Sequence, residues 1–141
     1  MKTLRIVPLG GLGEVGMNCL ALETDEDLLV IDCGITFPEE NYGIDLLHPD
    51  FSYLFERAEK VRGVFLTHGH EDHIGAIPFL WPRLRCPVYA TPFAAGLLDI
   101  KRLQEEGAPK VPLSLVHPGR TLNLDPFSIE FVQVAHSIPE G

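Results

Sequence analysis

The chain has 141 residues, of which 45% are hydrophobic and 22% charged, a composition that fits one globular domain and excludes a disordered chain. The formal net charge of −9 excludes a protein that holds nucleic acid by its overall field, so a polyanionic substrate would require a local cation such as a metal ion. No apolar run approaches the ~18 residues of a membrane span, and the apolar run within the first eight residues is too short for a secretion signal. We therefore expect a cytoplasmic protein without a membrane segment.

The first third of the chain predicts short strands. Residues 4–9, 17–23 and 28–32 are apolar runs, and Thr24–Asp27 between the last two is typical of a hairpin turn. Residues 37–50, rich in proline, glycine and acids, predict an irregular surface loop.

The rest of the chain alternates between helices and strands. Residues 52–61 predict an amphipathic helix that Gly63 closes, followed by a buried strand over 64–66. A second helix is predicted between a capping Thr91 and a terminating Gly107. Its predicted apolar face consists of Phe93, Leu97, Ile100 and Leu103. Alternating apolar residues predict a late strand, and the interleaved order of elements predicts an α/β fold with a mixed sheet.

The three cysteines, Cys19, Cys33 and Cys86, are odd in number and show no CxxC spacing. This pattern argues against a disulfide framework and against a cysteine-type zinc site. We expect buried thiols instead.

A glycine motif with GxGxxG spacing occupies residues 11–16. In a dinucleotide-binding fold these glycines would open a helix, and Asp32 could be the acidic partner. Residues 17–22, however, predict a strand, and too few residues separate Gly16 from Asp32 for a crossover helix and a second strand. We therefore interpret the motif as a turn.

A cluster of metal-binding side chains follows the predicted strand 64–66. His68, His70, Asp72 and His73 lie within six residues, too dense a group for a core histidine or a solvated loop to explain. In an extended loop His68 and His70 project to one side and can reach one metal ion. Asp72 and His73 lie beyond the bend and can face a second ion.

The HxHxDH pattern, with Asp32 at the end of an earlier strand, resembles the metallo-β-lactamase superfamily. Longer motifs over residues 8–18, 32–38, 67–78 and 135–139 resemble the ribonuclease J family, in the β-CASP branch of that superfamily. The resemblance covers the whole chain and implies an αββα sandwich. Residues 1–141 would then be the N-terminal part of a metallo-β-lactamase domain, with the β-CASP and C-terminal parts absent.

The resemblance implies a ligand set. His68, His70 and His136 match the ligands of the family's first zinc ion, and Asp72 and His73 match ligands of the second. Asp72 and His73 are accordingly also the candidate catalytic residues.

Other candidates are weaker. The resemblance makes Asp32 a supporting residue that orients the ligand loop. Ser137 adjoins a ligand and could reach a phosphate oxygen or bond to local backbone. His48 and His117 each precede a proline, which predicts extended surface turns and no metal ligation. Trp81 is expected to pack at the end of a short helix rather than stack on a nucleobase.

The resemblance implies zinc-dependent hydrolysis of RNA phosphodiesters, with 5′-to-3′ exoribonuclease and endoribonuclease activity and RNA as the partner of the parent enzyme. Two cations suit such a displacement, since they activate water and stabilise the leaving oxygen. The alternatives are a hydrolase of a small thioester or lactam on the same fold, and a catalytically inactive metal-binding fragment.

The family's site also uses an aspartate and a histidine downstream of His136. We therefore expect an incomplete catalytic domain, which is either a fragment or a truncated product. It should bind at most one zinc ion tightly and hydrolyse RNA negligibly on its own. Exposed apolar sheet surface should cause self-association, which light scattering would detect.

Overall fold

The computed structural model describes residues 3–13, 16–37 and 46–134. Its main feature is a mixed six-stranded sheet whose strands are hydrogen-bonded in chain order. The strands are β1 (Arg5–Gly10), β2 (Cys19–Glu23), β3 (Leu28–Ile31), β4 (Val61–Phe65), β5 (Val88–Ala90) and β6 (Leu113–Leu115). The first three strands are antiparallel neighbours, which confirms the predicted hairpin, and β3 to β6 are parallel. The predicted α/β class with a mixed sheet is confirmed.

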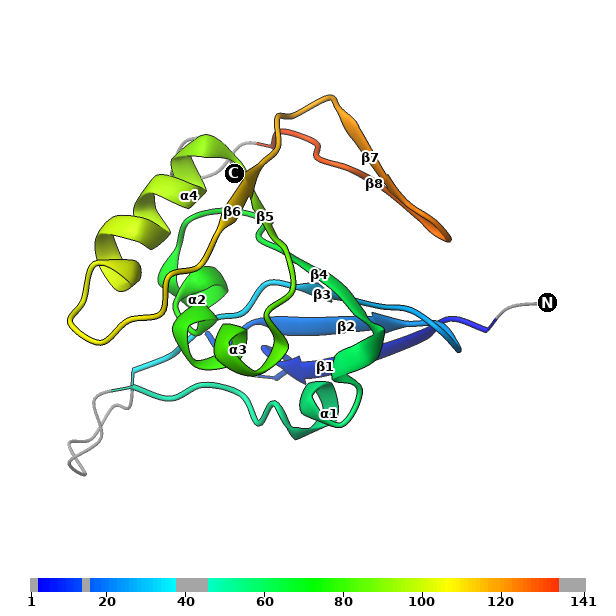
Figure 1. The fold of residues 1–141 in the computed structure, drawn as a ribbon, viewed down its shortest axis with the longest axis horizontal. Coiled ribbons are helices and arrows are strands. Elements are labelled where there is room, and N and C mark those ends of the chain that lie inside the picture. The colour runs from blue at the N-terminus through cyan, green and yellow to red at the C-terminus, as the bar shows by residue number, and fades with distance from the viewer. Residues whose placement is uncertain (1–2, 14–15, 38–45, 135–141) are drawn as a thin grey trace.

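Short helices follow several of the strands. They are α1 (Ser52–Phe55), the 3-10 turn η1 (Ala58–Lys60), α2 (Glu71–Ile74), α3 (Ile77–Leu84), α4 (Pro92–Leu98) and the π-helical turn η2 (Asp99–Leu103). Two further strands, β7 (Thr121–Leu124) and β8 (Phe127–Glu130), form an antiparallel hairpin. Figure 1 shows this hairpin extending away from the six-stranded sheet. The helices α2 and α3 lie together against the strands of that sheet. No helix among the described residues is long and apolar enough to cross a membrane.

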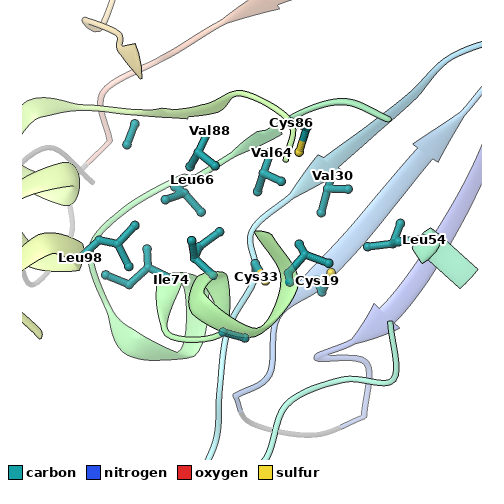
Figure 2. Close-up of a cluster of buried hydrophobic side chains, with 14 of the residues drawn as sticks. Cys19, Val30, Cys33, Leu54, Val64, Leu66, Ile74, Cys86, Val88 and Leu98 are labelled. Atoms are coloured by element: carbon teal, nitrogen blue, oxygen red, sulfur yellow. The ribbon is translucent and has the colours of Figure 1, made fainter. Parts of the chain in front are cut away.

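The hydrophobic core lies between the sheet and its helices. Val30, Val64 and Val88 come from three adjacent parallel strands and gather with Ile74 of α2 and Leu98 of α4 (Figure 2). All five side chains are at most 1% exposed. The core therefore holds the helices that carry and flank the histidine cluster against the sheet.

The three cysteines belong to this core as free, buried thiols, as predicted. Burial raises the pKa of Cys19 to about 12 and that of Cys86 to about 11, and it raises the pKa of Cys33 well above its usual value. Thiols protonated to this extent are unreactive at neutral pH.

The opposite face of the sheet is less well covered. Phe65 stacks on Tyr89 with ring centroids 4.7 Å apart and meets Phe131, beyond β8, at 6.4 Å. A cavity of about 470 Å³ lies between Ile31 and Phe65 on the sheet and residues 129–134. Ile6, on β1, is 64% exposed. Self-association through this apolar face stays a prediction.

The predicted helix over 52–61 is wrong in length. It breaks after Phe55, and Val61 already belongs to β4. Arg57 leaves helical geometry, with φ −121° and ψ 25°, where its side chain reaches Glu23. Gly63 does not close a helix but lies within β4, where a Cβ atom would come within 2.8 Å of the Tyr89 ring. Close packing across strands, rather than helix termination, explains this glycine.

The second helix begins at Pro92 as predicted, and its predicted apolar face is correct only in part, because Leu97 and Leu103 pack against the core. The buried side chains are Ala94, Ala95 and Leu98, whereas Phe93 is 38% and Ile100 68% exposed. Two alanines let the helix approach the core closely. The π-helical turn that follows then adds a residue to the turn and rotates Ile100 outward.

The glycine motif forms a turn, as predicted. Gly11, Gly13 and Gly16 all have positive φ, and the strand β2 follows instead of a helix. This geometry excludes the dinucleotide-binding interpretation, which requires a helix after the glycines.

Candidate metal centre

The candidate site lies at the carboxyl ends of two adjacent parallel strands. Ile31 of β3 pairs with Phe65 of β4, so the segments that follow these residues leave the sheet side by side. Asp32 comes first after β3, and its backbone N–H donates to the Phe65 carbonyl at 2.9 Å. Residues 67–73, which we call the metal loop, follow β4. This is the edge of a parallel sheet at which α/β proteins bind ligands.

Asp32 connects the two segments. One carboxylate oxygen accepts the Thr67 backbone N–H at 2.7 Å, and the other accepts the Thr67 hydroxyl at 2.8 Å. The second oxygen also lies 2.7 Å from Nδ1 of His73. Because a carboxylate can only accept, Nδ1 of His73 carries the proton. His73 therefore keeps Nε2 as the nitrogen that can bind a metal.

The surroundings of His73 favour its charged form. Burial lowers the pKa of His73, but the hydrogen bond to Asp32 and the charges of Asp32 and Asp72 outweigh burial and raise the pKa above its usual value. The same carboxylates would attract a metal cation, so a proton and a metal ion compete for this ring.

Three imidazole rings meet in the metal loop. The His68 ring lies 4.0 Å from that of His73 and 4.9 Å from that of His70, measured between centroids. Nδ1 of His68 lies 3.0 Å from the Thr67 hydroxyl, the group that bonds to Asp32. One carboxylate is thus linked to His73 directly and to His68 through Thr67.

Asp72 follows on the first turn of α2. His70 precedes that helix in an extended conformation, so the chain bends between His70 and Asp72. The Asp72 carboxylate lies 3.5 Å from Nε2 of His73 and 3.2 Å from the side-chain amide of Asn18. The structure therefore brings His68, His70, Asp72 and His73 together with Asp32. His136 and Ser137 lie outside the described residues.

Two segments distant in sequence form hydrogen bonds to the backbone of α2. Its Asp72 carbonyl accepts the Asn18 N–H at 2.9 Å, and its His73 carbonyl accepts the Cys33 N–H at 2.7 Å. A Cβ atom on Gly34 would come within 1.6 Å of the Asp72 carbonyl oxygen. The segments that precede β2 and follow β3 therefore fix the position of the ligand-bearing turn.

The helix α4 and its π-helical turn support the metal loop from another side. Arg102 forms an ion pair with Glu71 at 2.7 Å, and the two side chains are only 13% and 24% exposed. Gly69 lies so close to Leu97 that a Cβ atom would come within 2.4 Å of that side chain. The loop is thus held at Gly69 and Glu71, between its histidines, by contacts with α4 and the π-helical turn.

The donor set fits a metal ion in part. Imidazole and carboxylate groups are the ligands that zinc takes outside cysteine sites. Among the described residues, neither Asp32 nor Asp72 forms an ion pair with a lysine or arginine. Within residues 3–13, 16–37 and 46–134, however, no three such side chains converge as a metal site requires. The family resemblance adds His136 to this set, and that residue lies outside the described ranges.

The weaker candidates have other contacts. His48 stacks on Phe51 at 4.9 Å and on Phe79 at 5.2 Å between centroids. His117 is exposed, and its carbonyl accepts the Arg120 N–H.

Trp81 lies in the last turn of α3 and donates its indole N–H to the Cys86 carbonyl at 3.0 Å. The tryptophan thus packs at the end of the short helix after the metal loop, where the sequence predicts it.

Asn18, Thr67 and Arg102 are contacts of the site to which the sequence assigned no role. Asn18 and Thr67 fall within the family motifs over residues 8–18 and 67–78. The sequence therefore singled out both residues but did not indicate which side chains they contact. Arg102 lies 31 positions after Glu71, and no local pattern pairs them.

The profile described as the metallo-beta-lactamase superfamily matches residues 12–134. The chain belongs to the metallo-β-lactamase superfamily. The match begins within the glycine motif and includes Asp32 and the whole metal loop.

Curated relatives sharpen this assignment. A ribonuclease J from Sinorhizobium meliloti is 44% identical over 99% of this chain, and one from Helicobacter pylori is 42% identical over 96%. A ribonuclease J2 from Bacillus subtilis is 40% identical over 99% of the chain. The resemblance to ribonuclease J is therefore confirmed. The chain spans only 26%, 20% and 25% of the lengths of these three relatives.

Solved structures show the same fold at lower identity. The metallo-β-lactamase fold protein YhfI from Bacillus subtilis matches with a TM-score of 0.62 and 21% identity, over 96% of this chain and 54% of its own. The Rm3 metallo-β-lactamase matches with a TM-score of 0.54 and 23% identity, over 87% of this chain and 46% of its own. At such identities the likeness describes the fold alone.

Proposed function

We propose that the chain provides part of the active site of a zinc-dependent ribonuclease that hydrolyses RNA phosphodiesters, with 5′-to-3′ exonuclease and endonuclease activity. The observation that carries the proposal is the 44% identity, over 99% of the chain, to a protein named ribonuclease J. The cluster of His68, His70 and His73 beside two carboxylates supports it, since these are the groups a zinc nuclease needs.

In this proposal His68, His70 and His136 hold one zinc ion, and Asp72 and His73 contribute to a second. When bound, such cations supply a nucleophile at neutral pH and the positive charge that a phosphodiester transition state needs. They also place positive charge at one point of a chain whose net charge is −9.

The protein's own groups prepare the ligands. Asp32 holds the proton on Nδ1 of His73 and so presents Nε2 to the ion. Thr67 shares its hydroxyl between Asp32 and His68, which restricts the rotation of the His68 ring. Ser137, next to His136 in sequence, is proposed to contact either a phosphate oxygen or local backbone.

The test compares the 141-residue chain with a chimera in which it replaces the matching segment of the Sinorhizobium meliloti relative. End-labelled single-stranded RNA distinguishes attack at the 5′ end from internal cleavage. We expect chelator-sensitive cleavage by the chimera and negligible cleavage by the chain alone, which spans 26% of that relative's length. His70→Ala or Asp72→Ala in the chimera should reduce the rate by more than the ~100-fold typical of residues that only support a ligand.

His117→Ala is the matched control, because His117 is exposed and stands outside the metal loop. A folded, zinc-loaded chimera that leaves RNA intact would contradict the proposed function. Robust turnover by the isolated chain would contradict the expectation that it lacks essential groups.

Two alternatives are tested by the same preparation. A chromogenic β-lactam and a thioester report hydrolysis of small substrates, which the fold also supports in the Rm3 metallo-β-lactamase. Zinc binding without any hydrolysis by the chimera would identify an inactive metal-binding segment.

A further inference from the structure

We propose that Asn18, two residues beyond the glycine motif, is a positioning residue that holds the carboxylate of Asp72 for metal binding. The inference deepens the proposed function and rests on Asp72 being a ligand. It also assigns a role to the glycine motif, which is not a nucleotide-binding element here.

The Asn18 side chain contacts three groups of the metal loop, two on Asp72 and one on His73. Its side-chain amide nitrogen lies 3.0 Å from the Asp72 carbonyl and 3.2 Å from the Asp72 carboxylate. The same nitrogen lies 3.3 Å from Nε2 of His73. Asn18 is 54 positions away from Asp72, so the fold rather than the local chain produces these contacts.

The backbone and the side chain of Asn18 act on different parts of Asp72. The backbone N–H donates to the Asp72 carbonyl at 2.9 Å, and the Asn18 carbonyl accepts the Gly34 N–H at 3.0 Å. These bonds fix the turn and survive any side-chain substitution. The side chain adds a second contact to the Asp72 carbonyl and a contact to Nε2 of His73, and it alone supplies a donor to the Asp72 carboxylate.

The glycine motif allows Asn18 to take this position. A Cβ atom at Gly11, where φ is +88°, would come within 2.5 Å of the Asn18 side-chain oxygen. A Cβ atom at the preceding Gly10 would come within 2.1 Å of the Met17 backbone oxygen. The end of β1 can therefore lie against residues 17–18 only because both positions lack a side chain.

An amide suits this position chemically. It donates a hydrogen bond to one carboxylate oxygen and leaves the other oxygen available to a cation. Because the amide is neutral, it neither repels a cation nor replaces it, as a lysine would. Neighbouring donors of this kind typically change metal affinity by ~10–100-fold.

The experiment measures the affinity for the second zinc ion, to which Asp72 contributes, by competition with a chromogenic chelator. It uses the chimera described above, because the 141-residue chain is expected to bind at most one zinc ion tightly. The variants are Asn18→Ala, Asp72→Ala and the double variant, with Asn123→Ala on β7 as the matched control. We expect Asn18→Ala to weaken binding of the second zinc ion by about 10–100-fold and Asp72→Ala to weaken it at least as much, while the ion held by His68 and His70 keeps its affinity. In the double variant Asn18→Ala should add less than about twofold, because both substitutions remove one interaction.

Thermal unfolding in the presence of a chelator checks the fold of each variant, and Asn18→Ser should recover part of the affinity by restoring a donor. Wild-type affinity in Asn18→Ala would overturn the inference, as would an Asp72→Ala variant that binds zinc normally. Additive losses in the double variant would also overturn it, since Asn18 would then act elsewhere. A wild-type chimera that binds no zinc would instead contradict the proposed function.

Discussion

Two buried carboxylates mark the two ends of the β3 region and have opposite surroundings. Glu23 pairs in register with Leu28 at the start of β3, and Asp32 follows the end of that strand. Glu23 is 2% exposed and Asp32 6%. Glu23 forms ion pairs with three basic residues and accepts the Tyr53 hydroxyl. The basic residues are Lys60 at 2.6 Å, Arg57 at 3.1 Å and Arg5 at 3.4 Å.

Asp32 has different partners, namely Thr67 and His73. Among the described residues no lysine or arginine pairs with it. The protein thus neutralises one buried carboxylate with its own cations and leaves the other in a cluster of imidazoles. The comparison teaches that lysine and arginine permanently neutralise the carboxylate at the Glu23 end. At the Asp32 end only a histidine, which can lose its proton, pairs with the carboxylate, so a metal cation can replace that proton.

Glu23→Gln tests the structural end and should have the largest effect on stability. The substitution keeps the shape of the side chain but removes the buried counter-charge of Lys60 and leaves Arg57 with only the exposed carboxylate of Glu56. Because these cations are 31% and 18% exposed, we expect a loss near the lower end of the range for broken buried pairs, about 3 kcal/mol. Urea denaturation measures the loss. A change below about 0.5 kcal/mol would contradict a structural role for the cluster.

The Glu23 cluster also predicts how stability depends on pH. Burial would raise the pKa of Glu23, but hydrogen bonds from Lys60 and Tyr53 and the charge of Lys60 outweigh burial and lower the pKa to about 2. A lowered carboxylate pKa stabilises the fold above the unfolded value, near 4.5, and this stabilisation is lost as pH falls toward 2. Urea midpoints between pH 6 and pH 3 should fall more steeply for the wild type than for Glu23→Gln. An equal pH dependence of the urea midpoints in the wild type and in Glu23→Gln would contradict a lowered pKa of Glu23.

Thr67→Val tests the other end and should have a smaller effect. The variant keeps the side-chain shape and the backbone bond to Asp32 but removes the hydroxyl shared with His68. We expect zinc affinity to fall about 10-fold, while Thr67→Ser retains it. Chelator competition gives both values. Equal affinities for the two variants would show that the hydroxyl does not orient the ligands.

Local sequence patterns predicted the parts of the site that are local. The spacing of His68, His70, Asp72 and His73 after a buried strand predicted that these side chains gather in one loop, as they do in the structure, whereas their binding of a metal stays a prediction. Asp32 was connected with the metal loop through the family resemblance and not through any local spacing. The glycine motif could be read as a turn because an apolar strand pattern, and no helix, follows it.

Contacts between distant segments could not be predicted in this way. Asn18 meets Asp72 across 54 positions, and Glu23 meets Arg57 and Lys60 across 34 and 37. The helix predicted over 52–61 failed for the same reason. Its periodicity was real, but the pairing of Val61 with Leu28 in the sheet and the attraction of Glu23 for Arg57 outweighed local helix preference.

The central claim, that the chain neutralises one buried carboxylate itself and leaves the other end for a metal, is tested most directly by zinc content. Elemental analysis of extensively dialysed protein gives the number of tightly bound ions per chain. We predict one zinc ion for the wild type and for Glu23→Gln, and none for the double variant His68→Ala/His70→Ala. A folded wild type with no zinc or with two ions, or a double variant that still retains zinc, would contradict the claim.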